Sequence, residues 1–309
     1  MRIEILLSTY NGEKYLRAQL DSLLRQSHPD FHVTVRDDGS KDGTRAILAE
    51  YEQAAPERIT WLRDGKNLGY PDCFWHLLEH APAADLYAFC DQDDVWEPDK
   101  LRCCAEKCGR EDPDTALLYV HDYRISDGEL NVYDEYHIRR WGYREDYPYN
   151  LLYFVMISGF AMVLNHRLRE RILRDELYGK GIPHDRWIFW CGFFAGKVIC
   201  DERMLVTYRR HEATVTITGK GNGKLLREWW NHDIRGDQMA RWEAIGRRFA
   251  ADYGQEIERK KAGLLSDWNL LCKEKGGPGA YFRRLFYPKR LKPTAAGELV
   301  LRISFLLNK

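Results

Sequence analysis

The strongest constraint in this sequence is a strand, loop and helix pattern that repeats directly after its first appearance. Ile3–Ser8 is a short apolar run, a polar loop follows, and Tyr15–Leu24 carries apolar residues at helical spacing. The same order returns in Phe31–Arg36 with Gly43–Tyr51, and in Ile59–Arg63 with Pro71–His80, before the apolar run Leu86–Cys90. Alternation of this length predicts an α/β fold with a mainly parallel sheet and helices on both faces.

Polar side chains follow the first, second and fourth of these strands at the point where each strand ends. In open α/β sheets, ligands bind outside the carboxyl ends of the strands. We therefore expect one site built from three groups, which are Ser8 to Asn11, Asp37 with Asp38, and Asp91 with Asp93 and Asp94.

The second half of the chain is less regular. Strands are expected at Leu117–His121, Gly159–Leu164 and Val198–Tyr208, and a helix is expected to begin near His184. Beyond the glycine-rich stretch 219–223, which is typical of a linker, helices are expected at Lys224–Tyr253 and Gln255–Cys272, followed by a basic aromatic tail. These patterns predict a catalytic domain over residues 1–218 and a helical extension over residues 219–309.

Charge and composition exclude several classes of protein. The 309 residues have no net charge, but residues 219–309 carry about +9 and the preceding residues about −9. The acidic first part argues against a nucleic-acid-binding protein. No apolar run reaches 18 residues, and Glu4 interrupts any signal-like start, which argues against transmembrane and secreted proteins. We expect a cytoplasmic protein whose cysteines are buried thiols, with a zinc site at Cys103, Cys104 and Cys108 as the weaker alternative.

The acidic run after the fourth strand has two interpretations. Asp91 and Asp93 lie on the same side of an extended chain, where their oxygens can hold a divalent cation. Alternatively, the run is a solvated turn in which Asp94 caps the following helix. The neighbouring strand ends favour the metal.

The loop after the second strand is similarly ambiguous. Asp37 and Asp38 precede Gly39 and Ser40, as in an ordinary turn before a helix. However, a carboxylate beside a nucleobase can accept a hydrogen bond from a ring N–H such as N3 of uracil or thymine. Ser8 and Tyr10 can add hydroxyl contacts and a stacking ring.

Taken together, the motifs resemble a known family. The chain is similar to the family 2 inverting glycosyltransferases with the GT-A fold, and most similar to bacterial rhamnosyltransferases of polysaccharide assembly. The resemblance covers about residues 1–215 and is carried by Ser8-Thr9-Tyr10-Asn11-Gly12, Asp37-Asp38-Gly39-Ser40, Asn67-Leu68-Gly69, Asp91-Gln92-Asp93-Asp94-Val95-Trp96, Ser158-Gly159, His184-Asp185 and Tyr208-Arg209-Arg210-His211.

The resemblance implies a role for each of the matching residues. A nucleotide sugar would be bound by Ser8, Tyr10 and Asp38, with Asn67 in the same nucleotide-binding set and Arg209 as a diphosphate contact. Mg²⁺ or Mn²⁺ would be bound by Asp93, Asp91 and His211.

The resemblance also implies that Asp185 is the catalytic base. Inverting transfer is a single displacement, so it needs one carboxylate to deprotonate the acceptor hydroxyl and a cation to stabilise the departing diphosphate. Without the motif, a helix N-cap is the alternative interpretation of His184-Asp185. Arg186 stands where the family commonly has an aromatic residue, and we expect Trp187 to contact the acceptor.

The basic tail predicts a second kind of contact. Residues 273–309 contain nine Lys and Arg against two Glu, interleaved with aromatic residues. Such a segment suits an anionic membrane surface and a lipid-linked saccharide acceptor at the inner face of the cell membrane. A basic helix packed on an acidic domain or on another protomer is the alternative.

We therefore expect a metal-dependent glycosyltransferase using dTDP-L-rhamnose, with UDP-linked galactose, glucose or N-acetylhexosamine as alternative donors. A non-catalytic nucleotide-sugar-binding protein is the second class of function. A nucleotidyltransferase would require a phosphate-binding Gly/Lys loop, which the sequence lacks.

Overall fold

The computed structural model describes residues 1–141, 157–174, 182–211, 238–253, 263, 278–292 and 295–307. The chain divides into two compact units. The first comprises residues 1–139 and 156–211, and the second comprises residues 140–155 and 212–309. Because residues 212–237 lie outside the described part, a domain boundary at 218/219 stays a prediction.

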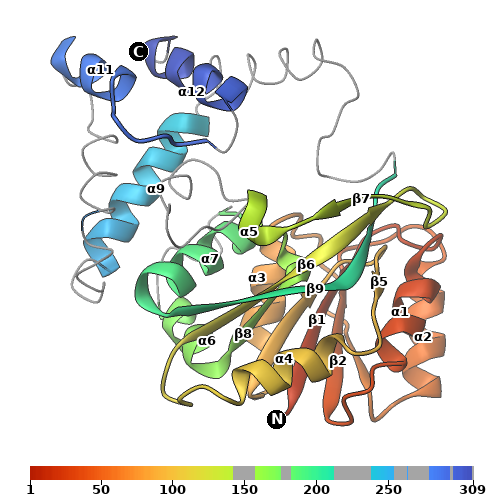
Figure 1. Ribbon diagram of the computed structural model, residues 1–309. Helices are drawn as coiled ribbons and strands as arrows, with labels where there is room; N and C mark the ends of the chain where they lie inside the picture. The colour runs from red at the N-terminus through yellow and green to blue at the C-terminus, as the bar shows by residue number, and fades with distance from the viewer. Residues whose placement is uncertain are drawn as a thin grey trace. The chain divides into compact units, whose positions relative to one another are not determined.

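The described part of the first unit is built on a nine-stranded sheet (Figure 1). The strand order is β3-β2-β1-β4-β8-β6-β9-β5, with β7 paired to β6. The strands are β1 Ile3–Thr9, β2 Phe31–Asp37, β3 Ile59–Leu62, β4 Leu86–Cys90, β5 Val95–Trp96, β6 Leu117–Ser126, β7 Val132–Tyr136, β8 Met162–Asn165 and β9 Lys197–Arg209.

The half of the sheet formed by β3, β2, β1 and β4 is parallel throughout. All five residues of β4 are buried, as are Ile3 to Leu7 of β1. Burial on both faces explains why these strands are nearly continuous apolar runs rather than alternating ones. In this half the predicted strand positions agree with the structure to within one residue.

The other half of the sheet corrects the prediction of a mainly parallel sheet. β8 is antiparallel to both β4 and β6, and β5 is antiparallel to β9, while β6 and β9 are parallel. Antiparallel neighbours need no helical crossover. The sequence between residues 117 and 165 accordingly lacks the strand and helix alternation of the first half.

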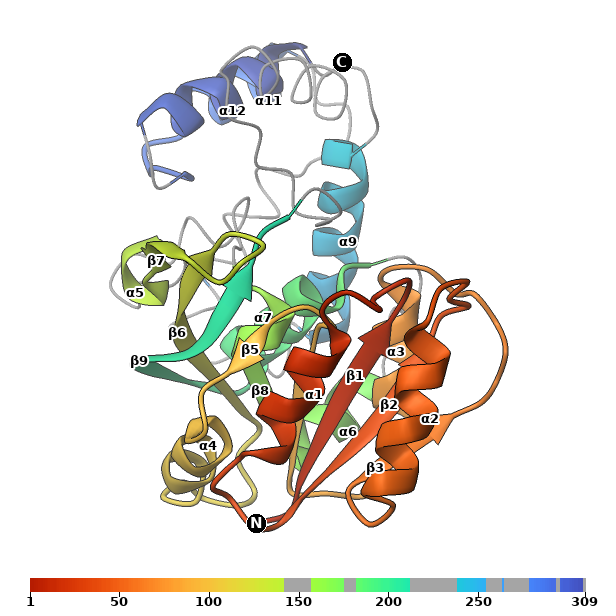
Figure 2. The ribbon, with the colours of Figure 1, turned by 90° about the vertical axis from the view of Figure 1, so that its right-hand side faces the viewer.

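Helices cover both faces of this sheet (Figures 1 and 2). α1 and α2 lie on one face, and α3, α6 and α7 lie on the other. The helices of the first unit are α1 Leu16–Leu24, α2 Thr44–Ala54, α3 Asp72–His80, α4 Lys100–Cys108, α6 His166–Leu173 and α7 His184–Ala195, and the short helix α5 spans Ile138–Trp141.

The strand order explains the two helical layers. From β1 the chain moves outward through α1 to β2 and through α2 to β3, and α3 then carries it back past β1 to β4. Since such crossovers are right-handed, reversing the direction of travel moves the helix to the opposite face. The strand order thus reverses between β1 and β4, and the carboxyl ends of these two neighbouring strands border the crevice where such sheets bind ligands.

The described cysteines of the first unit are free thiols, as predicted. Cys200 is only partly buried, whereas the others are buried, namely Cys73, Cys90, Cys103, Cys104, Cys108 and Cys191. In the part of the chain that the structure describes, no three His, Cys, Asp or Glu side chains are grouped as metal ligands, so the zinc alternative at α4 is not supported.

The described helices of the second unit are α9 Gln238–Tyr253, α11 Pro278–Leu285 and α12 Ala295–Leu307. α9 lies within the predicted helix 224–253, whereas the predicted helix 255–272 falls outside the described residues except for residue 263. The sequence analysis anticipated neither α11 nor α12. Over the described ranges, no helix is long and apolar enough to cross a membrane.

Candidate active site

The carboxyl ends of β2, β1 and β4 lie side by side and level with one another. Thr9 is paired with Asp37 in the register, and Leu7 is paired with Cys90. The loops that follow these strands therefore begin at one edge of the sheet, as the sequence predicts.

Hydrogen bonds join the loop after β1 to the loop after β2. The backbone N–H of Asn11 donates to Oγ of Ser40 over 2.8 Å, and Oδ1 of Asn11 accepts from the N–H of Lys41 over 2.8 Å. The Gly12 N–H donates to Oγ1 of Thr44 over 2.8 Å. These bonds hold the two loops as one rigid rim.

Gln92 joins the loop after β4 to the same rim. Its Oε1 accepts from the Tyr10 N–H over 2.8 Å, and its Nε2 donates to the Tyr10 carbonyl over 2.9 Å. A Cβ at Gly12 would overlap the Gln92 carboxamide, so this contact requires glycine there. Gln92 stands within the motif Asp91-Gln92-Asp93-Asp94, but its sequence position alone does not indicate this role.

Asp37 has a structural task. It is buried, and it accepts hydrogen bonds from Thr9, Ser40 and Arg45. Burial opposes ionisation, but the bonds from Ser40 and Arg45 outweigh it and lower the pKa of Asp37.

Asp38 is buried and shapes the neighbouring turn. Its carboxylate accepts from Nη1 of Arg36 over 2.6 Å and from the N–H groups of Leu68 and Gly69 over 2.7 and 2.8 Å. Nδ2 of Asn67 donates to the Asp38 carbonyl over 2.7 Å. A carboxylate has about four acceptor sites, so these three bonds leave room for one donor from a ligand.

Ser8 and Tyr10 occupy different environments at the end of β1. Tyr10 is half-exposed, which leaves its ring available for stacking. Ser8 is partly buried and forms a hydrogen bond with Cys73 of α3. Burial raises the pKa of the Cys73 thiol to about 11, and the hydrogen bond with Ser8 counteracts part of this rise.

Three carboxylates form an acidic cluster, which consists of Asp91 and Asp93 after β4 and Asp185 at the start of α7. Asp91 is partly buried, and the loss of hydration together with the negative charges of Asp93 and Asp185 raises its pKa to about 7. The structure therefore brings the expected metal ligands and the expected base into one electrostatic environment, although Asp93 and Asp185 are 92 positions apart in the sequence.

His211 reaches this cluster from the chain just beyond β9. Its Nε2 lies 2.7 Å from Oδ2 of Asp93, and its ring lies against Tyr15, with the ring centroids 4.7 Å apart. Both side chains of the His211–Asp93 pair are mostly buried.

Arg209 is buried and binds backbone. Its Nε donates to the Asp93 carbonyl over 2.8 Å and its Nη1 to the Gly128 carbonyl over 2.7 Å, while its guanidinium stacks over Tyr15. Its Nη2 has no hydrogen-bond partner among the described residues. Arg209 thus holds the acidic loop in place and retains one donor at the site.

Asp94 does not cap a helix, contrary to the alternative interpretation of the acidic run. It is fully buried and accepts from the backbone N–H of Arg209 over 3.1 Å. α4 begins six residues later, with Asp99 at its N-cap.

Lys100 is a buried cation that the sequence analysis missed. Its Nζ donates to the Phe160 carbonyl over 2.6 Å and lies 3.3 Å from the centroid of the Trp96 ring. Burial lowers its pKa to about 7, and the nearby Cys90, Asp94 and Asp91 counteract part of this effect.

Asp185 lies in the first turn of α7 and is not its N-cap. The N-cap position belongs to Pro183, and Oδ1 of Asp185 accepts from the Arg186 N–H over 2.7 Å. Loss of hydration raises the pKa of Asp185. A raised pKa makes a carboxylate a stronger base at neutral pH.

The ring of His184 fixes the start of α7. It is buried between aromatic rings and stacks on Phe74 with a centroid distance of 4.4 Å. Neither ring nitrogen has a hydrogen-bond partner among the residues that the structure describes, and burial lowers the pKa of His184 to about 3. A Cβ at Gly159 would overlap this ring, so Gly159 leaves the space in which the residue before Asp185 sits.

Tyr70 is another site residue without a sequence signal. It is half-exposed and lies edge-on to His184, with centroids 5.9 Å apart. Loss of hydration at its hydroxyl and the negative charges of Asp185 and Asp91 raise the pKa of Tyr70 above its usual range. Tyr70 therefore borders the acidic cluster from the α3 side.

Trp187 lies elsewhere than expected. It is fully buried and packs beside Trp190, with centroids 6.3 Å apart. α7 is apolar around most of its circumference, and such a helix lies in the core. Trp187 therefore occupies a core position rather than one that faces an acceptor.

The donor atoms at the cluster suit a divalent cation. Carboxylate oxygens and an imidazole nitrogen are ligands of Mn²⁺, and carboxylates are ligands of Mg²⁺. The repulsion that raises the pKa of Asp91 is what a bound cation would relieve. Within the described ranges, Asp91, Asp93 and His211 are not already grouped as three ligands around one point.

Solved structures share this fold. TarS from S. aureus in complex with UDP-GlcNAc is 13% identical with a TM-score of 0.59, and the alignment covers 99% of this chain and 92% of that chain. The mannosyltransferase PcManGT from Pyrobaculum calidifontis, in complex with GDP-Man and Mn²⁺, is 16% identical with a TM-score of 0.55, covering 99% of this chain and 86% of that chain. At these identities the likeness shows the fold alone, which is the GT-A fold with a mixed central sheet.

Curated relatives match parts of the chain. An uncharacterized glycosyltransferase, alr2836 from Nostoc sp., is 28% identical over 219 residues, which are 69% of this chain and 66% of the relative. The dTDP-rhamnosyl transferase RfbG from Shigella flexneri is 33% identical over 99 residues, which are 31% of this chain and 34% of the relative. The chain thus spans less than two thirds of the length of these relatives.

The family model described as glycosyl transferase family 2 matches residues 4–171. The match contains β1 to β4, the acidic run after β4 and the Ser158-Gly159 motif, and it covers more than half of the chain. The chain belongs to glycosyl transferase family 2.

Proposed function

We propose that this protein is a metal-dependent inverting glycosyltransferase. It moves a sugar from a nucleotide-diphosphate donor to a hydroxyl of a growing, lipid-linked bacterial surface polysaccharide. The observation that carries the proposal is the acidic cluster, in which the charge of Asp185 acts on Asp91 at the end of β4. A base beside a pair of metal-binding carboxylates is what single displacement at an anomeric carbon needs.

Asp185 acts as the general base. It takes the proton of the acceptor hydroxyl as the oxygen attacks the anomeric carbon from the face opposite the diphosphate. The bond from that carbon to the diphosphate oxygen breaks in the same step, so the configuration inverts. His184 and Gly159 support the base by fixing the first turn of α7.

Asp93, Asp91 and His211 hold the cation in this proposal. A divalent cation at the diphosphate stabilises the negative charge that develops on the leaving group. The Mn²⁺ in the PcManGT complex supports this assignment by analogy of fold. Arg209 holds the acidic loop by its backbone, and in this proposal it is also a contact of the diphosphate.

Ser8, Tyr10, Asp38 and Asn67 bind the nucleoside. The remaining acceptor site of Asp38 suits a ring N–H, and the half-exposed Tyr10 suits stacking on a base. N3–H of thymine and N3–H of uracil fit equally well.

We propose dTDP-L-rhamnose as the donor, which the partial similarity to a dTDP-rhamnosyl transferase supports. UDP-linked hexoses or N-acetylhexosamines are the alternative, which the UDP-GlcNAc bound to TarS supports. A non-catalytic binding protein is disfavoured, because such a protein needs no base at the position of Asp185.

A donor panel tests the proposal. The protein is incubated with Mn²⁺, a short water-soluble saccharide acceptor and one donor, which is dTDP-L-rhamnose, UDP-glucose, UDP-galactose or UDP-N-acetylglucosamine. The melting temperature and the release of nucleoside diphosphate are measured. A ligand that binds the native state raises its stability. We expect dTDP-L-rhamnose to give the largest shift and Mn²⁺-dependent turnover. The largest increase in melting temperature with a UDP sugar would select the alternative donor. Binding without turnover for every donor would contradict the proposal that the protein is an enzyme.

A further inference from the structure

The helices α11 and α12 of the second unit expose apolar side chains on their outer faces. Phe282 and Phe286 of the α11 segment are 65% and 68% exposed, and their rings stack with centroids 5.7 Å apart. Leu299 and Leu306 of α12 are 62% and 46% exposed. Exposed large apolar residues that gather on neighbouring elements mark an interaction surface.

α12 is apolar on both sides. Its inner face buries Leu301 and Phe305, while Leu299 and Leu306 lie on the exposed side. Glu298, Arg302 and Ser304 interrupt the apolar pattern, but large apolar residues that stay exposed on a helix already packed on one face indicate a further contact. With 13 residues, α12 is shorter than the roughly 20 residues needed to span a bilayer. Its length therefore suits a position at the membrane surface rather than across the membrane.

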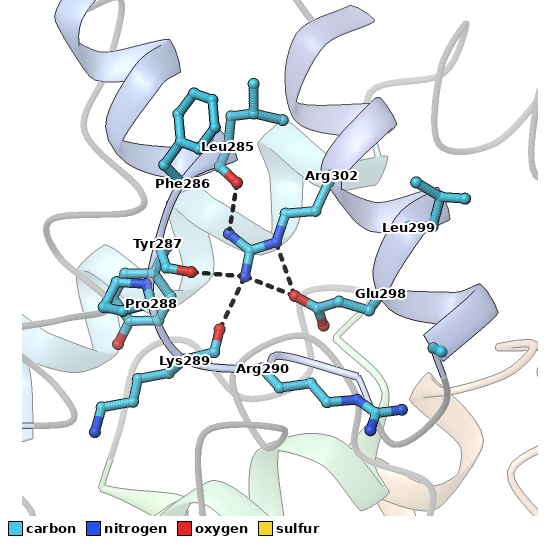
Figure 3. Close-up of a pocket in the computed structure, with 10 residues that line it drawn as sticks. Leu285, Phe286, Tyr287, Pro288, Lys289, Arg290, Glu298, Leu299 and Arg302 are labelled. Atoms are coloured by element: carbon cyan, nitrogen blue, oxygen red, sulfur yellow. Dashed lines mark hydrogen bonds and ion pairs between the residues drawn. The ribbon is translucent and has the colours of Figure 1, made fainter.

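Arg302 and Glu298 hold the described part of the connection between the two helices, which ends at Lys292 (Figure 3). The Arg302 guanidinium donates to the carbonyls of Arg284, Leu285, Tyr287 and Lys289 over distances of 2.5 to 3.2 Å. Oε1 of Glu298 accepts from Arg302, and its Oε2 accepts from the N–H groups of Leu291 and Lys292 over 2.7 and 2.8 Å. The hairpin is thus pre-organised before it meets any partner.

This loop also presents basic side chains. Lys289 and Arg290 are exposed beside Phe286 and Pro288, at the rim of an open hollow of about 570 Å³. Residues 278–307 contain six Lys and Arg but only one acidic residue, Glu298. Glu298 is bound to Arg302, and the segment as a whole carries a net positive charge.

We propose that the α11–α12 hairpin lies flat on an anionic lipid bilayer. Phe282, Phe286, Leu299 and Leu306 enter the boundary between headgroups and acyl chains, and Lys289 and Arg290 meet the anionic headgroups. An apolar face beside basic side chains has this mode of binding. The proposal rests on the proposed function only in that a lipid-linked acceptor gives the membrane contact its purpose.

The experiment measures co-sedimentation of the full chain with vesicles of phosphatidylcholine alone and of phosphatidylcholine with 30% phosphatidylglycerol. Two double variants remove the two halves of the surface, namely Phe282→Gln with Phe286→Gln, and Lys289→Glu with Arg290→Glu. Matched controls on the first unit are Tyr133→Gln, at a residue that is 59% exposed, and Arg25→Glu.

We expect the parent and the controls to bind the anionic vesicles, and each double variant to bind about tenfold more weakly. High salt is expected to weaken the binding of the parent, because exposed charges are screened. Equal pelleting of parent and hairpin variants, or equal binding of the parent to both kinds of vesicle, would overturn the proposal. The proposal would also be overturned if the parent were a dimer that the Phe variants convert to a monomer. A second copy of the chain would then cover the apolar face in place of the membrane.

Activity separates this proposal from the proposed function. The hairpin variants should keep the parental turnover with a short water-soluble acceptor, and Asp185→Asn should keep parental vesicle binding. If the hairpin variants lose turnover with the soluble acceptor as well, the segment serves the catalytic unit and the membrane assignment is wrong.

Discussion

Nε2 of His211 lies 2.7 Å from Oδ2 of Asp93, across 118 positions of sequence. The contact brings the chain after β9 to the acidic run after β4. Removing either partner should therefore affect the same cation.

Asp93→Ala should abolish Mn²⁺-dependent binding of a nucleoside diphosphate. It should leave the fold intact, because removing this carboxylate also removes its repulsion of Asp91 and Asp94. Calorimetric titration of dTDP and UDP with and without Mn²⁺ measures this. Asp114→Ala, at an exposed carboxylate paired with Arg167, is the control. Parental affinity of Asp93→Ala in the presence of Mn²⁺ would remove Asp93 from the metal site.

Asp185→Asn should retain donor and metal binding but reduce transfer by about 10²- to 10⁴-fold, the usual effect of losing a positioned base. The amide has nearly the same shape but cannot take the proton. Melting temperature and turnover are measured on one preparation. Asp201→Asn is the control, because Asp201 binds Tyr119 and Arg203 and should affect stability rather than turnover. Near-parental turnover of a folded Asp185→Asn variant would exclude Asp185 as the base.

Gly159→Ala should impair both stability and turnover. The new methyl group would overlap the buried ring of His184, and overpacking of this kind costs about 1–3 kcal/mol of unfolding free energy. Displacing His184 also moves the first turn of α7, and with it Asp185. Urea unfolding and turnover are the measurements. Gly279→Ala, where no atom lies within 4 Å of the added group, is the control, and indistinguishable behaviour of the two variants would contradict the prediction.

Gln92→Ala should weaken nucleotide binding. It removes both hydrogen bonds to the Tyr10 backbone, and each such bond contributes about 0.5–1.5 kcal/mol. The loop that carries Tyr10 then becomes less ordered before the ligand binds. Dissociation constants for dTDP and UDP are compared with those of Gln53→Ala, an exposed glutamine of α2. An unchanged dissociation constant would show that the contact does not organise the nucleotide site.

Asp37→Asn should reduce the dependence of the unfolding free energy on pH in the acidic range. Because the pKa of Asp37 is lowered in the folded protein, its carboxylate stabilises the fold above the unfolded pKa of about 3.9. That contribution is lost as the pH falls through the lower pKa of the folded state. The free energies of unfolding of parent and variant should therefore differ at pH 7 and converge as the pH falls below the lowered pKa of the folded state. Asp30→Asn, at an exposed position, is the control, and parallel profiles of Asp37→Asn and parent would refute the prediction.

The sequence by itself determined the parallel half of the sheet. The runs at β1, β2, β3 and β4 are local patterns, and each polar group stands directly after its strand, so the edge on which the site forms could be predicted. The grouping of Asp91, Asp93 and Asp185 also follows from motif order together with fold resemblance. The structure agrees with this part, because it brings the charges of all three carboxylates together.

Only the tertiary structure decided how the irregular half of the sheet is paired and what many site residues do. β8 lies antiparallel to both of its neighbours, and no local periodicity encodes that direction. The burial of Trp187 and of Asp94 could not be predicted for a related reason, since burial depends on what packs around a residue. The bonds from Gln92 to Tyr10 and from His211 to Asp93 join positions 82 and 118 apart. Such contacts arise from chain packing in three dimensions, and a one-dimensional pattern of apolar and polar residues carries no record of them.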